Sequence, residues 1–199
     1  MARGSVVWFT GLPASGKSTL ARQLARLLGE RGVRVEVLDG DFVRGTLSKG
    51  LGFTKEDRDS NVSRIGLVCG LLARNGVVAI AAAVAPYRAA RDAVRAQAGD
   101  FVEVYVSTPR DVCEARDGSG RWASARRGEI SRFTGLDDPY EPPVAPEVTI
   151  DLANEPPELG AARVLAWLET HGFVDAIGPS RPAEPLEQAL SALGFGGSR

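Results

Sequence analysis

Eight consecutive residues near the start of the chain have the types and spacing of a loop that binds phosphate. The pattern is G-x-x-x-x-G-K-S, and it follows the apolar run Val6–Phe9. Its glycines let backbone N–H groups turn inward around an anion, and the helix that follows adds the positive end of its dipole. The lysine supplies a cation to the β- and γ-phosphates, and the serine supplies a hydroxyl to Mg²⁺. We therefore predict binding of a nucleoside triphosphate by Gly11, Leu12, Pro13, Ala14, Ser15, Gly16, Lys17, Ser18 and Thr19.

A pair of carboxylates follows the second apolar segment. Asp39 and Asp41 flank Gly40, directly after the alternating run Val33–Leu38. In an open α/β sheet, ligands bind at the carboxyl ends of the strands. There, one carboxylate can organise Mg²⁺ and the other can accept a proton from an attacking hydroxyl. The simpler interpretation is an Asp-Gly turn with no catalytic role. The nearby phosphate loop favours a catalytic role for the two carboxylates.

The class of enzyme is narrowed by motifs that the sequence lacks. GTPases usually carry an Asn/Thr-Lys-x-Asp guanine motif, which does not occur here. The apolar run Val77–Val84 does not end in an aspartate, so Asp39 is the nearest candidate for the carboxylate beside the metal. A kinase of small molecules fits best, with Lys17, Asp39 and Asp41 as catalytic residues and Ser18 and Asp39 at the metal. Lys17 is expected to face solvent until a phosphate arrives.

Strand and helix patterns alternate along the chain, which predicts an α/β fold of the P-loop NTPase type with a mostly parallel sheet and helices on both faces. The expected strands are Ser5–Thr10, Val33–Leu38, Val77–Val84, Phe101–Ser107 and Glu147–Leu152. The expected helices are Lys17–Glu30, Arg58–Asn75, Tyr87–Ala98, Pro109–Arg116 and Pro157–Thr170. Pro109 is expected at the first position of its helix, where proline is favoured.

The segment Asp117–Phe133 interrupts this alternation. It holds four arginines and few aliphatic residues. Such a run can be ordinary surface charge, but in a P-loop kinase an arginine-rich segment often closes over the phosphates as a lid. We predict an arginine-rich lid at 117–133, mobile in the empty site because its arginines repel one another.

Composition and charge set the remaining expectations. The chain has 199 residues and a net charge of −1, which gives no general nucleic-acid footprint. Cys69 and Cys113 are expected to be buried thiols, and the single histidine, His171, to end a helix. No signal peptide or membrane-spanning run is seen, so a cytoplasmic enzyme without membrane contact is expected. We predict a kinase domain at 1–175, then a proline-containing linker and short helix at 176–199.

Several short motifs, in one order and spacing from Val7 to about Asp151, resemble the adenylylsulfate kinase (APS kinase) family. They include the phosphate loop, Asp39-Gly40-Asp41 with Arg44, Leu51-Gly52-Phe53, Asp57-Arg58, Asn61, Arg64-Ile65-Gly66, Pro86-Tyr87-Arg88, Arg91-Asp92, Cys113-Glu114-x-Arg116-Asp117, Arg126, Gly128-Glu129-Ile130, Phe133-Thr134-Gly135 and Asp138-x-Tyr140-Glu141-x-Pro143. The resemblance implies phosphorylation of the 3′-hydroxyl of adenosine 5′-phosphosulfate (APS) by MgATP, giving PAPS. It also implies a homodimer.

The resemblance further implies roles for single residues. Asp41 would be the base, and Arg44, Arg58 and Asn61 would hold the phosphosulfate end. Phe53 and Phe133 would clasp the adenine. Arg116 and Arg126 would lie near ATP, while Val84, Ala85 and Arg132 complete the expected substrate-binding set.

The chain departs from the family's usual pattern in the substrate half. Phe42, Ser63 and Ala85 stand where the family has asparagine, arginine and serine, and Ser119 stands where it has a lid lysine. Arg121 and Arg132 can return positive charge from nearby. Two alternatives to APS phosphorylation therefore remain. One is a paralogous kinase acting on another small nucleotide, such as cytidine diphosphoramidate. The other is a nucleotide-binding regulatory subunit without turnover.

Overall fold

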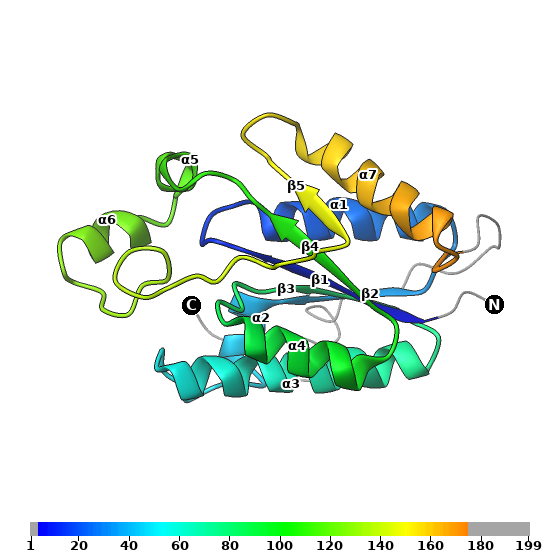
Figure 1. Cartoon of the computed structure of the whole chain (residues 1–199), viewed down its shortest axis with the longest axis horizontal. Coiled ribbons are helices and arrows are strands. Elements are labelled where there is room, and N and C mark those ends of the chain that lie inside the picture. Colours follow the sequence, from blue (N-terminus) through cyan, green and yellow to red (C-terminus); the bar gives the residue numbers. More distant parts are fainter. Residues whose placement is uncertain (1–3, 175–199) are drawn as a thin grey trace.

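Five parallel strands form the centre of the structure, a computed structural model that describes residues 4–174 (Figure 1). They are β1 (Ser5–Gly11), β2 (Val35–Asp39), β3 (Val78–Ala82), β4 (Phe101–Val106) and β5 (Val148–Ile150). Their order in the sheet is β2-β3-β1-β4-β5, and every neighbouring pair is parallel. The predicted parallel α/β fold is confirmed. Because β1 is central, the phosphate loop that follows it lies in the middle of the sheet's carboxyl edge.

Seven helices surround the sheet within the described residues. They are α1 (Lys17–Glu30), α2 (Gly40–Gly45), α3 (Lys55–Arg74), α4 (Arg88–Ala98), α5 (Arg110–Arg116), α6 (Arg121–Arg126) and α7 (Pro157–Thr170). Figure 1 shows α1 and α7 on one face of the sheet and α3 and α4 on the other. The predicted bounds of α1 and α7 are confirmed.

The side chains of β1 alternate between two hydrophobic cores. Val7 and Phe9 pack with the residues of α1 and α7, whereas Val6 and Trp8 pack with those of α3 and α4. All four are fully buried. A strand buried on both faces needs apolar residues at every position, which explains the unbroken apolar run before the phosphate loop.

Two short helices were not expected from the sequence. The turn at Asp39 and Gly40 continues into α2, because the Asp39 carboxylate accepts a hydrogen bond from the Asp41 N–H and caps the helix. The lid contains α6, which begins after Gly120 in the left-handed region. Both are shorter than two turns, too short for a hydrophobic period to reveal.

Helix ends also differ in detail. Helix α3 begins three residues before the predicted Arg58, because the Thr54 hydroxyl accepts from the Asp57 N–H. The prediction for Pro109 is wrong by one position, since it is the N-cap of α5 with an extended backbone. His171 is the C-cap of α7, as expected.

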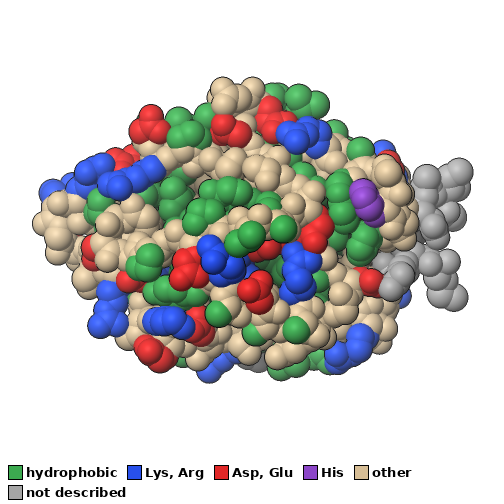
Figure 2. All heavy atoms as spheres, in the orientation of Figure 1, with side chains coloured by type: hydrophobic (Ala, Val, Ile, Leu, Met, Phe, Trp, Pro, Cys, Tyr) green, Lys and Arg blue, Asp and Glu red, His purple; other side chains and the backbone are tan. Residues whose placement is uncertain are grey.

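The remaining expectations can be compared with the described residues. Cys69 and Cys113 are buried and unbridged, and burial raises the pKa of Cys69 to about 12 and that of Cys113 to about 11. Of the helices described, none is long and apolar enough to cross a bilayer. Positive and negative side chains are interspersed over the face drawn in Figure 2. The predicted linker and helix at 176–199 lie outside the described residues.

Candidate active site

A cavity of about 490 Å³ opens at the carboxyl edge of the sheet, between the phosphate loop, the β2–α2 junction and the predicted lid. Figure 1 places α5 and α6 beyond this edge. Most of the predicted site residues line the cavity: Pro13, Ala14, Gly16, Lys17, Ser18, Thr19, Asp39, Asp41, Arg44, Phe53, Arg58, Asn61, Val84, Ala85, Arg116, Arg132 and Phe133. Four of the predicted residues are not among the lining residues: Gly11, Leu12, Ser15 and Arg126.

At the end of the phosphate loop, the backbone has a conformation that only glycine adopts easily. Gly16 has φ +100° at the N-cap of α1, and a Cβ atom there would lie 2.3 Å from Leu152 Cδ1. Ala14 also has a positive φ of 61°. This geometry turns the loop sharply into α1, whose first N–H groups then point toward the cavity.

Lys17 does not face solvent, so that expectation is wrong. The lysine is 8% exposed, and its Nζ donates to the carbonyl oxygens of Gly11 (3.1 Å) and Leu12 (2.6 Å) and to Ser15 Oγ (3.3 Å). Burial lowers its pKa to about 8, partly opposed by the nearby Asp41 and Asp39. The ammonium is thus held inside the loop by three oxygen acceptors.

The two carboxylates occupy different surroundings. Asp39 ends β2 and is held as the N-cap of α2. Asp41, in the first turn of α2, has a side chain 87% exposed and lines the cavity. Its Oδ1 lies 3.8 Å from an Nη of Arg121, which comes from the lid. Asp39 is therefore fixed by backbone contacts, while Asp41 is free to meet a ligand.

Three predicted substrate residues form one cluster beside α2 and α3. The guanidinium groups of Arg44 and Arg58 lie 4.6 and 5.4 Å from the ring centre of Phe53, which is 40% exposed. Arg58 also pairs with Asp138 at 3.3 Å and donates to the carbonyls of Phe53 and Arg132. Burial lowers the pKa of both arginines. Arg58 thereby connects the Phe53 loop to the end of the lid.

The lid is anchored on the phosphate loop by a small hydrophobic cluster of its own. Trp122 is 2% exposed, packs edge-to-face on Phe133 at 4.8 Å and donates from Nε1 to the Pro13 carbonyl at 3.2 Å. Cys113 and Ala125 complete the buried cluster. Phe133, predicted to stack on a base, is therefore packed into the cavity wall.

The expected repulsion between the lid arginines is wrong for three of the four. Arg126 donates to both carboxylate oxygens of Glu114, and Arg127 does the same to Glu129. Arg121 faces Asp41 and lies 5.9 Å above the Phe133 ring. Each of these positive charges has a carboxylate neighbour. Arg126 is held by Glu114 and is not among the residues that line the cavity, so its predicted place near ATP stays a prediction.

Two buried polar atoms at the cavity have no hydrogen-bond partner among the described residues. They are Asn61 Oδ1 and Thr134 Oγ1, in residues 6% and 2% exposed. Buried polar atoms are rarely left unpaired, so both are available to a ligand. Asn61 was predicted as a substrate residue, whereas Thr134 was not, although it belongs to the motif Phe133-Thr134-Gly135 that resembles the family.

Only two of the four departures from the family pattern lie at the cavity. Ala85 and Ser119 line it, whereas Phe42 and Ser63 are not among the lining residues. Arg121, which also lines the cavity, restores a positive charge two residues from Ser119.

The residues present fit a magnesium ion held partly by a nucleotide. Ser18 and Asp39 supply a hydroxyl and a carboxylate at the cavity. No cluster of three or more His, Cys, Asp or Glu suited to a metal occurs among residues 4–174. Magnesium bound with nucleotides needs no such cluster, because phosphates and waters complete its octahedron.

Sequence comparisons place this site in a known family. A family model described as adenylylsulphate kinase matches residues 3–151. The adenylyl-sulfate kinase of Gloeothece citriformis is 51% identical over 172 residues, covering 86% of this chain and 98% of that protein. A probable bifunctional SAT/APS kinase of Sorangium cellulosum is 55% identical over 171 residues, but the match covers only 29% of that protein's length.

Solved structures agree with the sequence comparisons. The APS kinase CysC of Mycobacterium tuberculosis, solved in complex with AMPPNP and APS, superposes with a TM-score of 0.81 at 42% identity. The match covers 85% of this chain and 99% of that one. Since the family model spans most of the sequence and a relative of nearly the same length is half identical, this chain belongs to the adenylylsulphate kinase family.

Proposed function

We propose that this protein is an adenylyl-sulfate kinase, which transfers the γ-phosphoryl group of ATP to the 3′-hydroxyl of APS and releases PAPS and ADP. The observation that carries the proposal is the meeting, in one cavity, of the phosphate loop with the exposed carboxylate of Asp41, in the helix that follows β2. The half-identical relatives named as adenylyl-sulfate kinases support the choice of substrate.

The acceptor is activated by Asp41 in this proposal. The 3′-oxygen attacks the γ-phosphorus, the bond to the β–γ bridging oxygen breaks, and the hydroxyl proton passes to the Asp41 carboxylate. Asp41 suits this role because its side chain is exposed inside the cavity while its backbone is fixed in α2. Arg121, 3.8 Å away, places a positive charge beside this carboxylate.

In this proposal, aromatic rings stack on the adenine of APS and a polar side chain contacts the edge of the base. Phe53 and Phe133, both at the cavity, supply two aromatic faces. The unpartnered Asn61 Oδ1 can accept from an N–H donor of the ligand. Arg44 and Arg58 place positive charge beside Phe53 for the phosphosulfate end.

In this proposal, ATP binds at the side of the cavity that the phosphate loop forms. When its phosphates enter the loop, the Lys17 ammonium exchanges carbonyl acceptors for phosphate oxygens, which are stronger partners. Arg116, whose Nη donates to the Leu152 carbonyl at 2.9 Å, lines the same part of the cavity. Ser18 and Asp39 would hold Mg²⁺ together with the phosphates, and the ion would supply positive charge to the phosphate oxygens.

The test is to detect PAPS directly. Incubation with MgATP and APS should give PAPS and ADP in equal amounts by mass spectrometry. Asp41→Asn should lower kcat about 100- to 10,000-fold, because only proton acceptance is lost. Asp39→Asn keeps a helix-capping side chain but should raise the Mg²⁺ concentration needed for activity. Asp111→Asn, an exposed α5 residue outside the cavity, is the matched control.

The same assay separates the alternatives. ADP release with a cytidine diphosphate-linked acceptor, and none with APS, would select the paralogous kinase, for which Ala85 and Ser119 at the cavity are the supporting departures. ATP binding without turnover of any acceptor would select a regulatory subunit. We also expect a homodimer in the cytoplasm, which light scattering and cell fractionation test.

A further inference from the structure

The cavity wall at 84–86 contains an unusual backbone conformation. Ala85 follows β3, is 3% exposed and lines the cavity, yet its φ is +43°. A residue with a Cβ atom rarely adopts this left-handed region, and the cost is borne only where surrounding contacts impose it. Something outside the cavity must therefore hold this wall in place.

Three consecutive carbonyl groups of the wall are each held from behind by a different donor. The Thr10 hydroxyl donates to the Val84 carbonyl at 2.7 Å, and the Glu141 N–H donates to the Pro86 carbonyl at 2.8 Å. Between them, an Nη of Arg91 donates to the Ala85 carbonyl at 2.7 Å. Ala85, the residue with the positive φ, is thus the one of the three whose carbonyl accepts a hydrogen bond from a charged side chain.

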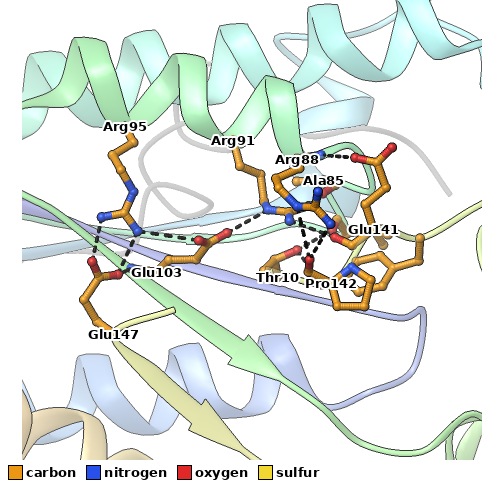
Figure 3. A network of polar contacts seen from close by, with 11 residues as sticks. Thr10, Ala85, Arg88, Arg91, Arg95, Glu103, Glu141, Pro142 and Glu147 are labelled. Carbon is orange, nitrogen blue, oxygen red and sulfur yellow. Dashed lines mark hydrogen bonds and ion pairs between the residues drawn. The ribbon is translucent and has the colours of Figure 1, made fainter. Parts of the chain in front are cut away.

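Arg91 itself is a buried charge that the phosphoryl-transfer chemistry does not use. It projects from α4, is 1% exposed, and pairs through Nε with Glu103 of β4 at 2.7 Å. Its second Nη donates to the Glu141 carbonyl at 2.8 Å. Figure 3 shows the guanidinium between Glu103 on one side and Ala85 and Glu141 on the other. Its planar fork reaches these three acceptors through three separate nitrogens, whereas an ammonium offers all its donors from one nitrogen.

From this geometry we propose that Arg91 is a positioning residue for the acceptor: it holds Ala85 in the left-handed conformation and so sets the wall against which the acceptor binds. The wall lies at the end of β3, which pairs with β2, the strand that ends at Asp39. This proposal for Arg91 depends on the proposed function in one point, which is the identity of the acceptor. Its signature is a higher KM for the acceptor, with kcat and the KM for ATP little changed.

Arg95 provides a matched control one turn along the same helix. It belongs to the same ionic network, pairing with Glu147 at 2.6 Å and with Glu103 at 3.5 Å (Figure 3). Its remaining hydrogen bond goes to the Phe101 carbonyl, away from residues 84–86. Arg95→Met should lower the melting temperature without changing the KM for APS. A purely structural role for the network would give Arg91 and Arg95 variants the same kinetic result.

The decisive experiment is a double-mutant cycle. Arg91→Lys keeps a positive charge beside Glu103, but its single nitrogen replaces three that each reach a different acceptor, so the contact with the Ala85 carbonyl is lost. The substitution should raise the KM for APS about tenfold, which corresponds to the strain energy that Ala85 releases. In an Ala85→Gly background the same substitution should raise that KM by less than about threefold, because glycine adopts positive φ without strain. An unchanged KM in Arg91→Lys, an equal rise in Arg95→Met, or no relief by Ala85→Gly would each overturn the proposal.

Two further measurements keep the result interpretable. If Arg91→Lys folds poorly, Arg91→Met combined with Glu103→Gln removes both buried charges together and should show the same rise in KM. A crystal structure of either variant, without substrate, determines the backbone conformation of Ala85 directly. Ala85 should leave the left-handed region, and a φ still near +43° would overturn the proposal. Absence of PAPS from the unmodified protein would instead contradict the proposed function alone.

Discussion

At the scale of single residues, Lys17 makes nucleotide binding depend on pH. Burial lowers its pKa to about 8, but phosphate binding requires the charged ammonium. Above about pH 8, ATP binding should therefore take up a proton, and the Kd for ATP should rise by up to about tenfold per pH unit. Calorimetric titration in two buffers of different ionisation enthalpy measures this proton uptake directly.

The control for this effect is Lys17→Arg, whose guanidinium keeps its charge across the same range. Its Kd for ATP should lose the pH dependence, whatever its absolute value. The same pKa shift also determines how stability changes with pH. A lysine whose pKa is lower in the folded protein than in the unfolded chain binds fewer protons when folded. The free energy of unfolding should thus increase between about pH 8 and pH 10.5. Absence of proton uptake near pH 8.5 would contradict the buried ammonium.

At the scale of elements, Trp122 should control how easily the lid opens. Its buried ring contributes about 3–5 kcal/mol of packing, which must be given up when 117–133 leaves the phosphate loop. Trp122→Ala should therefore speed tryptic cleavage after Arg121, Arg126 and Arg127 at least about tenfold. Trp167→Ala is the matched control, because Trp167 belongs to α7, a helix that Figure 1 shows far from α6.

Ligands should reverse this effect in the unmodified protein. ADP with the acceptor should protect the three arginine sites, because bound phosphates add contacts that only the closed lid makes. The mobility predicted for the lid stays a prediction, but its basis changes from repulsion among arginines to the strength of one aromatic anchor. Equal cleavage with and without ligands would mean that the lid does not close over the site.

Helix α3 carries Arg58 and Asn61 to the cavity, and its approach to α4 depends on one glycine. A Cβ atom at Gly66 would lie 2.6 Å from Val94 Cγ2, whereas at Gly70, one turn later, the nearest contact would be 4.0 Å from Ala98. Gly66→Ala should thus lower the free energy of unfolding by about 1–3 kcal/mol. Gly70→Ala should raise it by about 0.5–1 kcal/mol, through helix propensity alone. Denaturant unfolding of both variants checks the contrast.

At the scale of the whole molecule, the described core extends to residue 174. Val174 is 3% exposed and belongs to the core of α1 and α7, with Phe173 packed against it. A chain ending at residue 175 should keep the melting temperature and activity of the full chain. A chain ending at residue 172 should lose about 1.5–3 kcal/mol for the valine alone. If the first truncation unfolds the protein, the predicted domain boundary is wrong.

Much of the fold follows from local pattern. Helices α1 and α7 agree with prediction residue for residue, because each has a long hydrophobic period and clear ends. The phosphate loop could be predicted because all of its groups lie within eight residues, so their meeting requires no distant partner. In contrast, α2 and α6 depend on a capping carboxylate and on packing, which a period does not reveal.

The sequence by itself determined the class of the protein: a phosphate loop, two carboxylates after the second strand, and a set of motifs in the order of one kinase family. Tertiary structure alone decided the order of the strands, the burial of Lys17, the meeting of Arg121 with Asp41 and the strained backbone at Ala85. The physical reason is distance along the chain. Spacing encodes contacts between near neighbours, whereas desolvation, ion pairing and imposed strain arise only when residues from separate elements are packed together.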